Sequence, residues 1–249
     1  RKPSDMGDSQ WIWKMHSVGL LPSSYQPDYF TEELRSYVRH RKRLLEGASR
    51  SVNRIQKSLI LMNIQLPVVI SDVTGKSGCQ IIEAILQGER DACRLASLAD
   101  SRIRADKSTL IKSLTGFWKE NYLFELSQHW EMYKFHQKQL KSCDEKIDAL
   151  LQRQLTQTGH HDLVYEVPKG QKKKRRQKND PSFPIEVYAY QLSDGVNLLE
   201  IEGISYRFIL TLLGEVGMDL SDFPKSKNFV SWLSPVSYTH LTLPTKCWV

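Results

Sequence analysis

Two aspartates near the start of the chain are the first residues whose type and spacing could support chemistry. Asp5 and Asp8 lie three residues apart where an apolar-periodic segment begins, so on a helix both carboxylates face one side. Carboxylate oxygens are preferred ligands of Mg²⁺, and two such ions can activate a nucleophile in phosphodiester chemistry. The alternative is helix capping, because aspartates satisfy free amides at a helix N-terminus. The spacing alone favours capping, since this pattern is frequent by chance.

A second group of residues is cationic and lies on a predicted long helix. This helix is expected to begin near Thr31, whose hydroxyl would cap it, and its apolar residues keep a near-heptad spacing. Its other positions are rich in arginine and lysine, which would either contact a phosphate backbone or form a solvated face. The candidate phosphate-binding residues on this helix are Arg35, Arg39, Arg43, Arg50, Arg54 and Lys57.

A denser basic run occurs further along the chain, just before Pro181. Its charge predicts a mobile arm that grips nucleic acid, with a localisation signal or a plain linker as alternatives. The candidate residues of this run are Lys172, Lys173, Lys174, Arg175 and Arg176.

The segment after the basic run resembles a helix–hairpin–helix. In that motif a glycine-containing hairpin offers backbone N–H groups to DNA phosphates without reading bases. Gly203 fits the first hairpin glycine, whereas Ser205 stands where a second glycine is usual. Gly203 is therefore a further candidate nucleic-acid contact.

Length and composition define the class of protein. The chain has 249 residues, a formal net charge of +7 and four scattered cysteines. The basic excess favours a polyanionic partner, and the cysteine spacing predicts free thiols in a reducing compartment rather than a metal site. Helical periodicity dominates and no apolar run reaches the length of a membrane span. A mainly α-helical, cytoplasmic protein without a membrane partner is expected.

The order of these segments predicts five parts. They are residues 1–66 as terminal helices of a larger domain, 67–158 as a coiled-coil-like helical arm, 159–184 as a basic linker, 185–235 as the start of a helix–hairpin–helix-like domain, and 236–249 as a tail that resembles non-native sequence. A chain truncated at both ends is expected.

Four ordered segments resemble one family. The segment KPSDMGDSQWIWKMHSVGLL resembles the K-x-x-D-x-x-D stretch of the DEDD transposases of the IS-one-ten insertion-sequence family, which also includes the Piv/MooV-type invertases. The segment ELRSYVRHRKRLLEGASRSVNRIQKSLILMNIQL is similar to that family's long arginine-rich helix, and DVTGKSGCQIIEAILQGE to its glycine turn and helix. LLEIEGISYRFILTLLGEVGMDLSDFPKSKNFVSWLSP resembles the opening of its C-terminal transposase domain.

The resemblance implies a fold and an activity. The family combines an RNase H/RuvC-like domain, which carries an Asp–Glu–Asp–Asp metal tetrad, with a helical arm and a C-terminal domain that bears a nucleophilic serine. Asp5 and Asp8 match the last two aspartates of the tetrad and would be catalytic Mg²⁺ ligands in the complete protein. The expected partners are the DNA of the element ends and target, a structured guide RNA and further copies of the chain, and the expected location is the bacterial or archaeal nucleoid.

The chain departs from the family pattern at both ends. The first aspartate and the glutamate of the tetrad have no counterpart, and VSYTHLTLPTKCWV stands where the serine-bearing segment is expected. No serine is therefore assigned as nucleophile, and this chain alone is predicted not to cleave DNA. Two other functions fit the residues: a non-catalytic nucleic-acid-binding protein in which both aspartates are caps, and a helical scaffold that oligomerises through residues 110–155.

Overall fold

The computed structural model describes residues 5–21, 28–159, 163–165, 174–217, 220, 221, 223 and 225–233. These residues form helices and turns and contain no strand, so the prediction of a mainly α-helical chain is confirmed. None of the described helices combines the length and apolarity that crossing a membrane requires. The helices are α1 (Asp5–Ser17), α2 (Tyr29–Leu61), α3 (Leu66–Val69), α4 (Lys76–Leu86), α5 (Ala92–Ser97), α6 (Lys107–Ser113), α7 (Glu120–Thr158), α8 (Ile185–Leu192), the 3-10 turn η2 (Leu198–Glu200), α9 (Tyr206–Glu215) and α10 (Ser226–Leu233).

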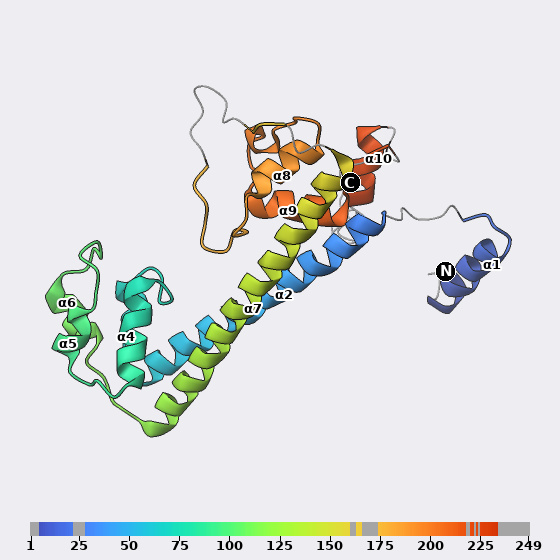
Figure 1. Ribbon diagram of the computed structural model, residues 1–249. Helices are drawn as coiled ribbons and strands as arrows, with labels where there is room; N and C mark the ends of the chain where they lie inside the picture. The colour runs from blue at the N-terminus through green and yellow to red at the C-terminus, as the bar shows by residue number, and fades with distance from the viewer. Residues whose placement is uncertain are drawn as a thin grey trace, which may run out of the picture.

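Two long helices form the centre of the molecule. Figure 1 shows α2 and α7 side by side and antiparallel, with small helices gathered at each end of the pair. Each long helix buries a stripe at alternating three- and four-residue intervals, the spacing at which helices pack in coiled coils. The buried stripe of α2 is Thr31, Leu34, Val38, Arg41, Leu44, Ala48, Ser51, Ile55, Ser58 and Leu59.

Two hydrophobic cores lie at the two ends of the helix pair. One joins the first half of α2 and the second half of α7 to α8 and α9, where Leu34, Ile147 and Ile185 are fully buried. The other joins the remaining halves to α3–α6, where Ile55 and Leu126 are fully buried. The long pair therefore connects two packed units that lie at its opposite ends (Figure 1).

The N-terminus of α2 differs from the prediction. The helix begins at Tyr29, and the Asp28 carboxylate caps it by accepting a hydrogen bond from the Thr31 backbone N–H at 3.2 Å. Thr31 is buried inside the first turn. Aspartate and threonine are both favoured as helix caps, so residue type alone does not show whether Asp28 or Thr31 caps the helix.

The arm is built differently from the predicted parts. Within the predicted arm of residues 67–158, the chain forms the short helices α3–α6, and only α7, which begins at Glu120, is long. The partner of α7 is α2, because the buried stripe of α2 packs on it along its length. In packing terms α2 thus belongs to the arm, although the predicted boundary at residue 66 placed it with α1.

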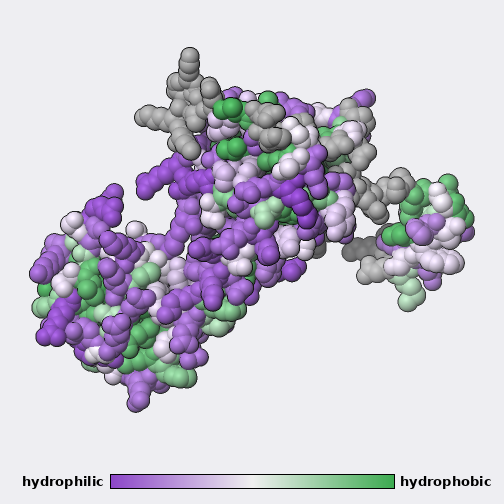
Figure 2. All heavy atoms as spheres, in the orientation of Figure 1, coloured by the Kyte–Doolittle hydropathy of each residue, from purple (hydrophilic) through white to green (hydrophobic). Residues whose placement is uncertain are grey.

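The helix α1 stands apart from the rest of the described chain (Figure 1). Trp11, Ile12 and Trp13 on this helix are each more than half exposed. Figure 2 shows the resulting apolar surface on α1. The apolar side chains of α1 are thus not covered by the described helices.

Candidate nucleic-acid interface

The first two candidate arginines of α2 bind the end of α9. Arg35 donates hydrogen bonds from Nε to the Gly214 carbonyl at 3.2 Å and from Nη2 to the Glu215 carbonyl at 2.7 Å. Arg39 contacts the Glu215 carboxylate through two bonds of 2.8 and 2.6 Å. The last carbonyls of a helix have no partner within it, so Arg35 caps the end of α9. Arg39 adds an ion pair with the Glu215 side chain, and the two arginines together fix α9 on α2.

Arg41, a further cation of α2, lies inside the helix pair. Its Nε lies 2.5 Å from Oδ1 of Asp144 on α7, and both side chains are about 4% exposed. The same guanidinium donates to the Asn179 carbonyl at 3.2 Å, and Asp144 accepts a further bond from the Ser182 backbone N–H at 3.0 Å. This buried pair therefore ties α2, α7 and the chain before α8 together.

The remaining cations of α2 point to solvent. Arg43, Arg50, Arg54 and Lys57 are exposed, as is Lys42, and no ion pair joins any of these five to another described residue. From residue 43 to residue 57 the helix advances by about 21 Å, at about 1.5 Å per residue. We call these five residues the α2 cationic row.

A groove runs beside the first part of this row. It has a volume of about 770 Å³ and lies between α2, α9 and the segment that contains Asn179. Lys42, Arg43 and Arg50 line it from α2, and Arg207 lines it from α9. Figure 2 shows hydrophilic residues over most of the visible face of the helix pair. The row and the groove thus form one continuous basic surface.

Arg207 is a groove residue that the sequence analysis missed. Its Nε lies 3.2 Å from Asp180, and its Nη2 donates to the Gln177 side chain at 2.9 Å. In the sequence, Arg207 is recognisable only as a cation in the first helical turn after the predicted hairpin. Its place in the groove could not be predicted, because only tertiary packing brings α9 against α2.

The described part of the basic run is not a free arm. Arg176 donates to the Pro181 and Phe183 carbonyls at 2.7 and 2.8 Å and also pairs with Glu186. Its guanidinium lies 4.8 Å from the centre of the Tyr206 ring. The expected mobile arm is therefore anchored to the fold at Arg176, whereas Arg175 is exposed. Lys172 and Lys173 lie outside the described residues.

The rest of the run meets the predicted hairpin. Lys174 donates from Nζ to the Ile201 and Ile204 carbonyls at 3.3 and 2.9 Å. Gly203 lies in the same turn with φ +85°, and no atom lies within 4 Å of where its side chain would be. Lys174, Arg175 and Gly203 together line a hollow of about 360 Å³. The structure thus brings the basic run and the predicted hairpin, two separate candidate nucleic-acid contacts, together.

The hairpin itself differs from a pair of full helices. The element before Gly203 is the three-residue turn η2, and only the element after it, α9, is a helix of ten residues. Ser205 caps α9 by accepting a hydrogen bond from the Phe208 N–H at 3.2 Å. Ser205 therefore has a local role in the position where a second glycine was expected.

The two candidate metal ligands lie on α1. Asp8 is exposed, and Asp5 is the first residue of the helix, while its side chain lies outside the described atoms. Among the described residues no group of three histidine, cysteine or carboxylate side chains could hold a metal ion. The described part of the chain therefore contains no Mg²⁺ site.

The contribution of the Glu215 carboxylate to the stability of the fold depends on pH. Hydrogen bonds from Arg39 hold the pKa of Glu215 below its ordinary value of 4.5, although partial burial opposes this. A carboxylate with a lowered pKa stabilises the fold fully above pH 4.5, and this contribution is lost as the pH falls through the folded pKa.

We therefore expect Glu215→Gln to reduce the free energy of unfolding by about 1 kcal/mol or less at pH 7, the range of exposed ion pairs. The difference from the parent chain should shrink in urea unfolding curves as the pH falls below 4.5 and through the lowered folded pKa of Glu215. The exposed Glu131 on α7 provides the control as Glu131→Gln. A Glu215→Gln difference that does not decrease at all as the pH is lowered from 7 through the acid range contradicts the assignment.

No protein-family model, no curated protein and no solved structure matches the chain.

Proposed function

We propose that this chain is the helical, nucleic-acid-binding part of a DNA transposase or recombinase of the IS-one-ten kind. The observation that carries the binding proposal is the α2 cationic row, five exposed cations without an ion-pair partner among the described residues. The family proposal is supported by the four ordered segments that resemble these transposases. Its partners would be the DNA of an insertion sequence, a structured RNA and further copies of the chain.

The division of the arginines supports this use of the row. Arg35, Arg39 and Arg41 contact carbonyls and carboxylates of the fold, so their charges are occupied. The cations of the row are solvated by water, which phosphate oxygens can replace. Each phosphate neutralised in this way releases condensed counterions, which makes binding favourable and dependent on salt.

The chemistry of strand cleavage is proposed only for the complete protein. There Asp5 and Asp8 would supply two carboxylates of the metal tetrad, and Mg²⁺ would supply Lewis-acid stabilisation of the leaving oxygen. Two carboxylates are too few to hold two such ions. The purified chain is therefore proposed to bind nucleic acid without cutting it.

A salt titration tests the binding proposal. Fluorescence anisotropy would follow binding of the chain to a 12-nucleotide single strand and to a 20-base-pair duplex between 50 and 300 mM KCl. Five phosphate contacts predict a slope of log K against log salt of about −3.5 for the single strand and about −4.5 for the duplex. A slope near zero for both, or no binding at 50 mM KCl, would overturn the proposal.

A further inference from the structure

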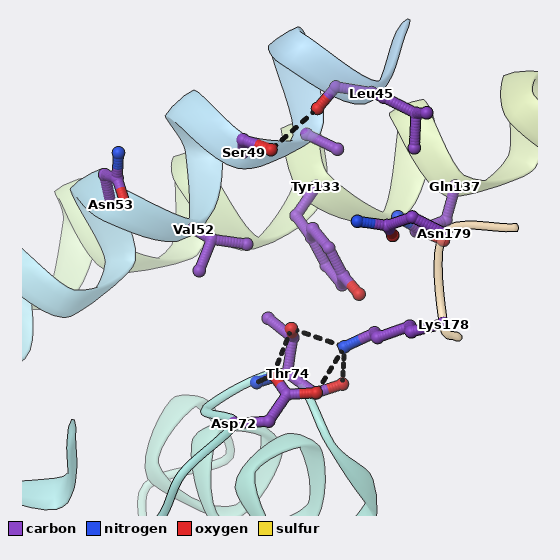
Figure 3. Close-up of a pocket in the computed structure, with 11 residues that line it drawn as sticks. Leu45, Ser49, Val52, Asn53, Asp72, Thr74, Tyr133, Gln137, Lys178 and Asn179 are labelled. Carbon is purple, nitrogen blue, oxygen red and sulfur yellow. Dashed lines mark hydrogen bonds and ion pairs between the residues drawn. The ribbon is translucent and has the colours of Figure 1, made fainter. Parts of the chain in front are cut away.

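A second cavity lies on the other side of the segment that borders the groove. It has a volume of about 340 Å³ and is enclosed by α2, α7, the turn before α4 and residues 178–179. Figure 3 shows side chains from all four elements pointing toward this space. Its volume lies at the lower end of the range of small-molecule sites, about 300–1,000 Å³.

The cavity presents side-chain amides from three different elements. Asn53 comes from α2, Gln137 from α7 and Asn179 from the segment before α8. None of these amides makes a side-chain hydrogen bond to another described residue. An amide offers two donors and an acceptor, so Gln137 and Asn179 can recognise the edge of a planar polar ligand, while Asn53 lies further along α2 at the end of the cavity (Figure 3).

The one cation of the cavity wall is already neutralised. Nζ of Lys178 donates to Oδ2 of Asp72 at 2.8 Å and to the carbonyl and hydroxyl of Thr74 at 2.8 and 2.6 Å. Burial disfavours the Asp72 carboxylate, but the bonds from Lys178 and Thr74 outweigh this and lower its pKa. The cavity is therefore polar without an excess positive charge, which suits an uncharged ligand better than a phosphate.

An aromatic side chain completes the wall. Tyr133 projects from α7 with its hydroxyl directed toward Lys178 (Figure 3). Its ring is held in place by stacking on Trp130, with the two ring centres 5.6 Å apart. Aromatic rings and amides at one site are the usual means by which proteins hold an unstacked base.

The cavity lies next to the basic groove. Leu45, Ser49 and Asn179 line both spaces, so a strand whose phosphates occupy the groove lies within reach of the cavity. We propose that this cavity takes one unstacked nucleobase from a single strand bound along α2. This inference rests on the proposed function, and it adds that part of the affinity comes from a base.

The test compares two single strands that share a backbone. One is a 12-nucleotide mixed-sequence strand, and the other is a 12-mer in which every base is replaced by an abasic tetrahydrofuran unit. At 50 mM KCl we expect the strand with bases to bind the parent chain about 10-fold more tightly. Asn53→Ala and Gln137→Ala should each bring this ratio toward about 2, and neither should change the affinity for the abasic strand.

The control is Gln128→Ala, which removes an exposed amide of α7 outside the cavity. This variant should keep the full ratio of affinities for the two strands. Gln137→Glu, which alters the hydrogen-bonding pattern at nearly constant shape, provides a second variant and should also lower the ratio. Running both strands as RNA and as DNA identifies which sugar the site prefers.

Unchanged ratios in Asn53→Ala, Gln137→Ala and Gln137→Glu would overturn the base site, while salt-dependent binding of the abasic strand would leave the proposed function intact. If neither strand binds, the proposed function fails, and the base site fails with it.

Discussion

Replacing Asp144 with asparagine is expected to lower the free energy of unfolding by about 3–5 kcal/mol, the usual cost of removing one partner of a buried ion pair. Asparagine keeps the volume of the side chain but leaves the Arg41 guanidinium without a countercharge. Both side chains are about 4% exposed, so water cannot replace the lost partner. Urea unfolding followed by circular dichroism at 222 nm measures the loss.

Two further variants make this prediction specific. Glu145→Gln removes the neighbouring exposed carboxylate on α7 and should change stability by about 0.5 kcal/mol or less. The double variant Arg41→Met/Asp144→Leu replaces the pair with apolar side chains and should recover most of the lost stability, because it leaves no buried charge. A single variant as stable as the parent chain would show that the pair is not buried in solution.

The variant Gly78→Ala is expected to destabilise the chain by about 3 kcal/mol, the upper end of the usual effect of overpacking. Helix propensity alone predicts the opposite sign, since alanine stabilises a helix by about 1 kcal/mol relative to glycine. Gly78 lies in α4, however, and an added Cβ would come within 2.0 Å of the Val73 carbonyl oxygen. The backbone would have to move, so the steric effect should prevail.

Thermal unfolding of Gly78→Ala and of Gln80→Ala separates the two effects. Gln80 is exposed on the same helix, so its replacement tests propensity without a clash and should leave the midpoint nearly unchanged. A Gly78→Ala chain that unfolds at a higher temperature than the parent would contradict the close approach of α4 to the turn before it.

Periodicity predicted the elements well where a stripe of apolar residues repeats. The heptad-like spacing along residues 34–59 indicates a long helix that packs on another, and α2 does so on α7. The exceptions are the polar members of the stripe. Arginine is usually exposed, and only the position of Asp144 on a distant helix explains the burial of Arg41.

The candidate surface was predictable only in part. Exposed cations such as Arg50 and Arg54 lie where the helical pattern places them. Arg39 and Arg176 have the same type and similar neighbours in sequence, yet their charges are bound by Glu215 and Glu186. Which cations remain free to bind phosphate depends on contacts with residues across a loop or more than 100 positions away. Local sequence contains no signal for the contacts between distant residues.

The most direct test of the α2 cationic row is a comparison of salt slopes between two triple variants. Arg43→Gln/Arg50→Gln/Arg54→Gln removes three cations of the row, and Arg104→Gln/Lys107→Gln/Lys112→Gln removes three exposed cations at and before α6, outside the row. The net charge falls equally in both. For the 12-nucleotide single strand, we predict that the row variant loses about 2 of the roughly 3.5 units of slope, while the α6 variant keeps the parent slope. Equal slopes for the two variants would contradict the claim that this face of α2 binds phosphates.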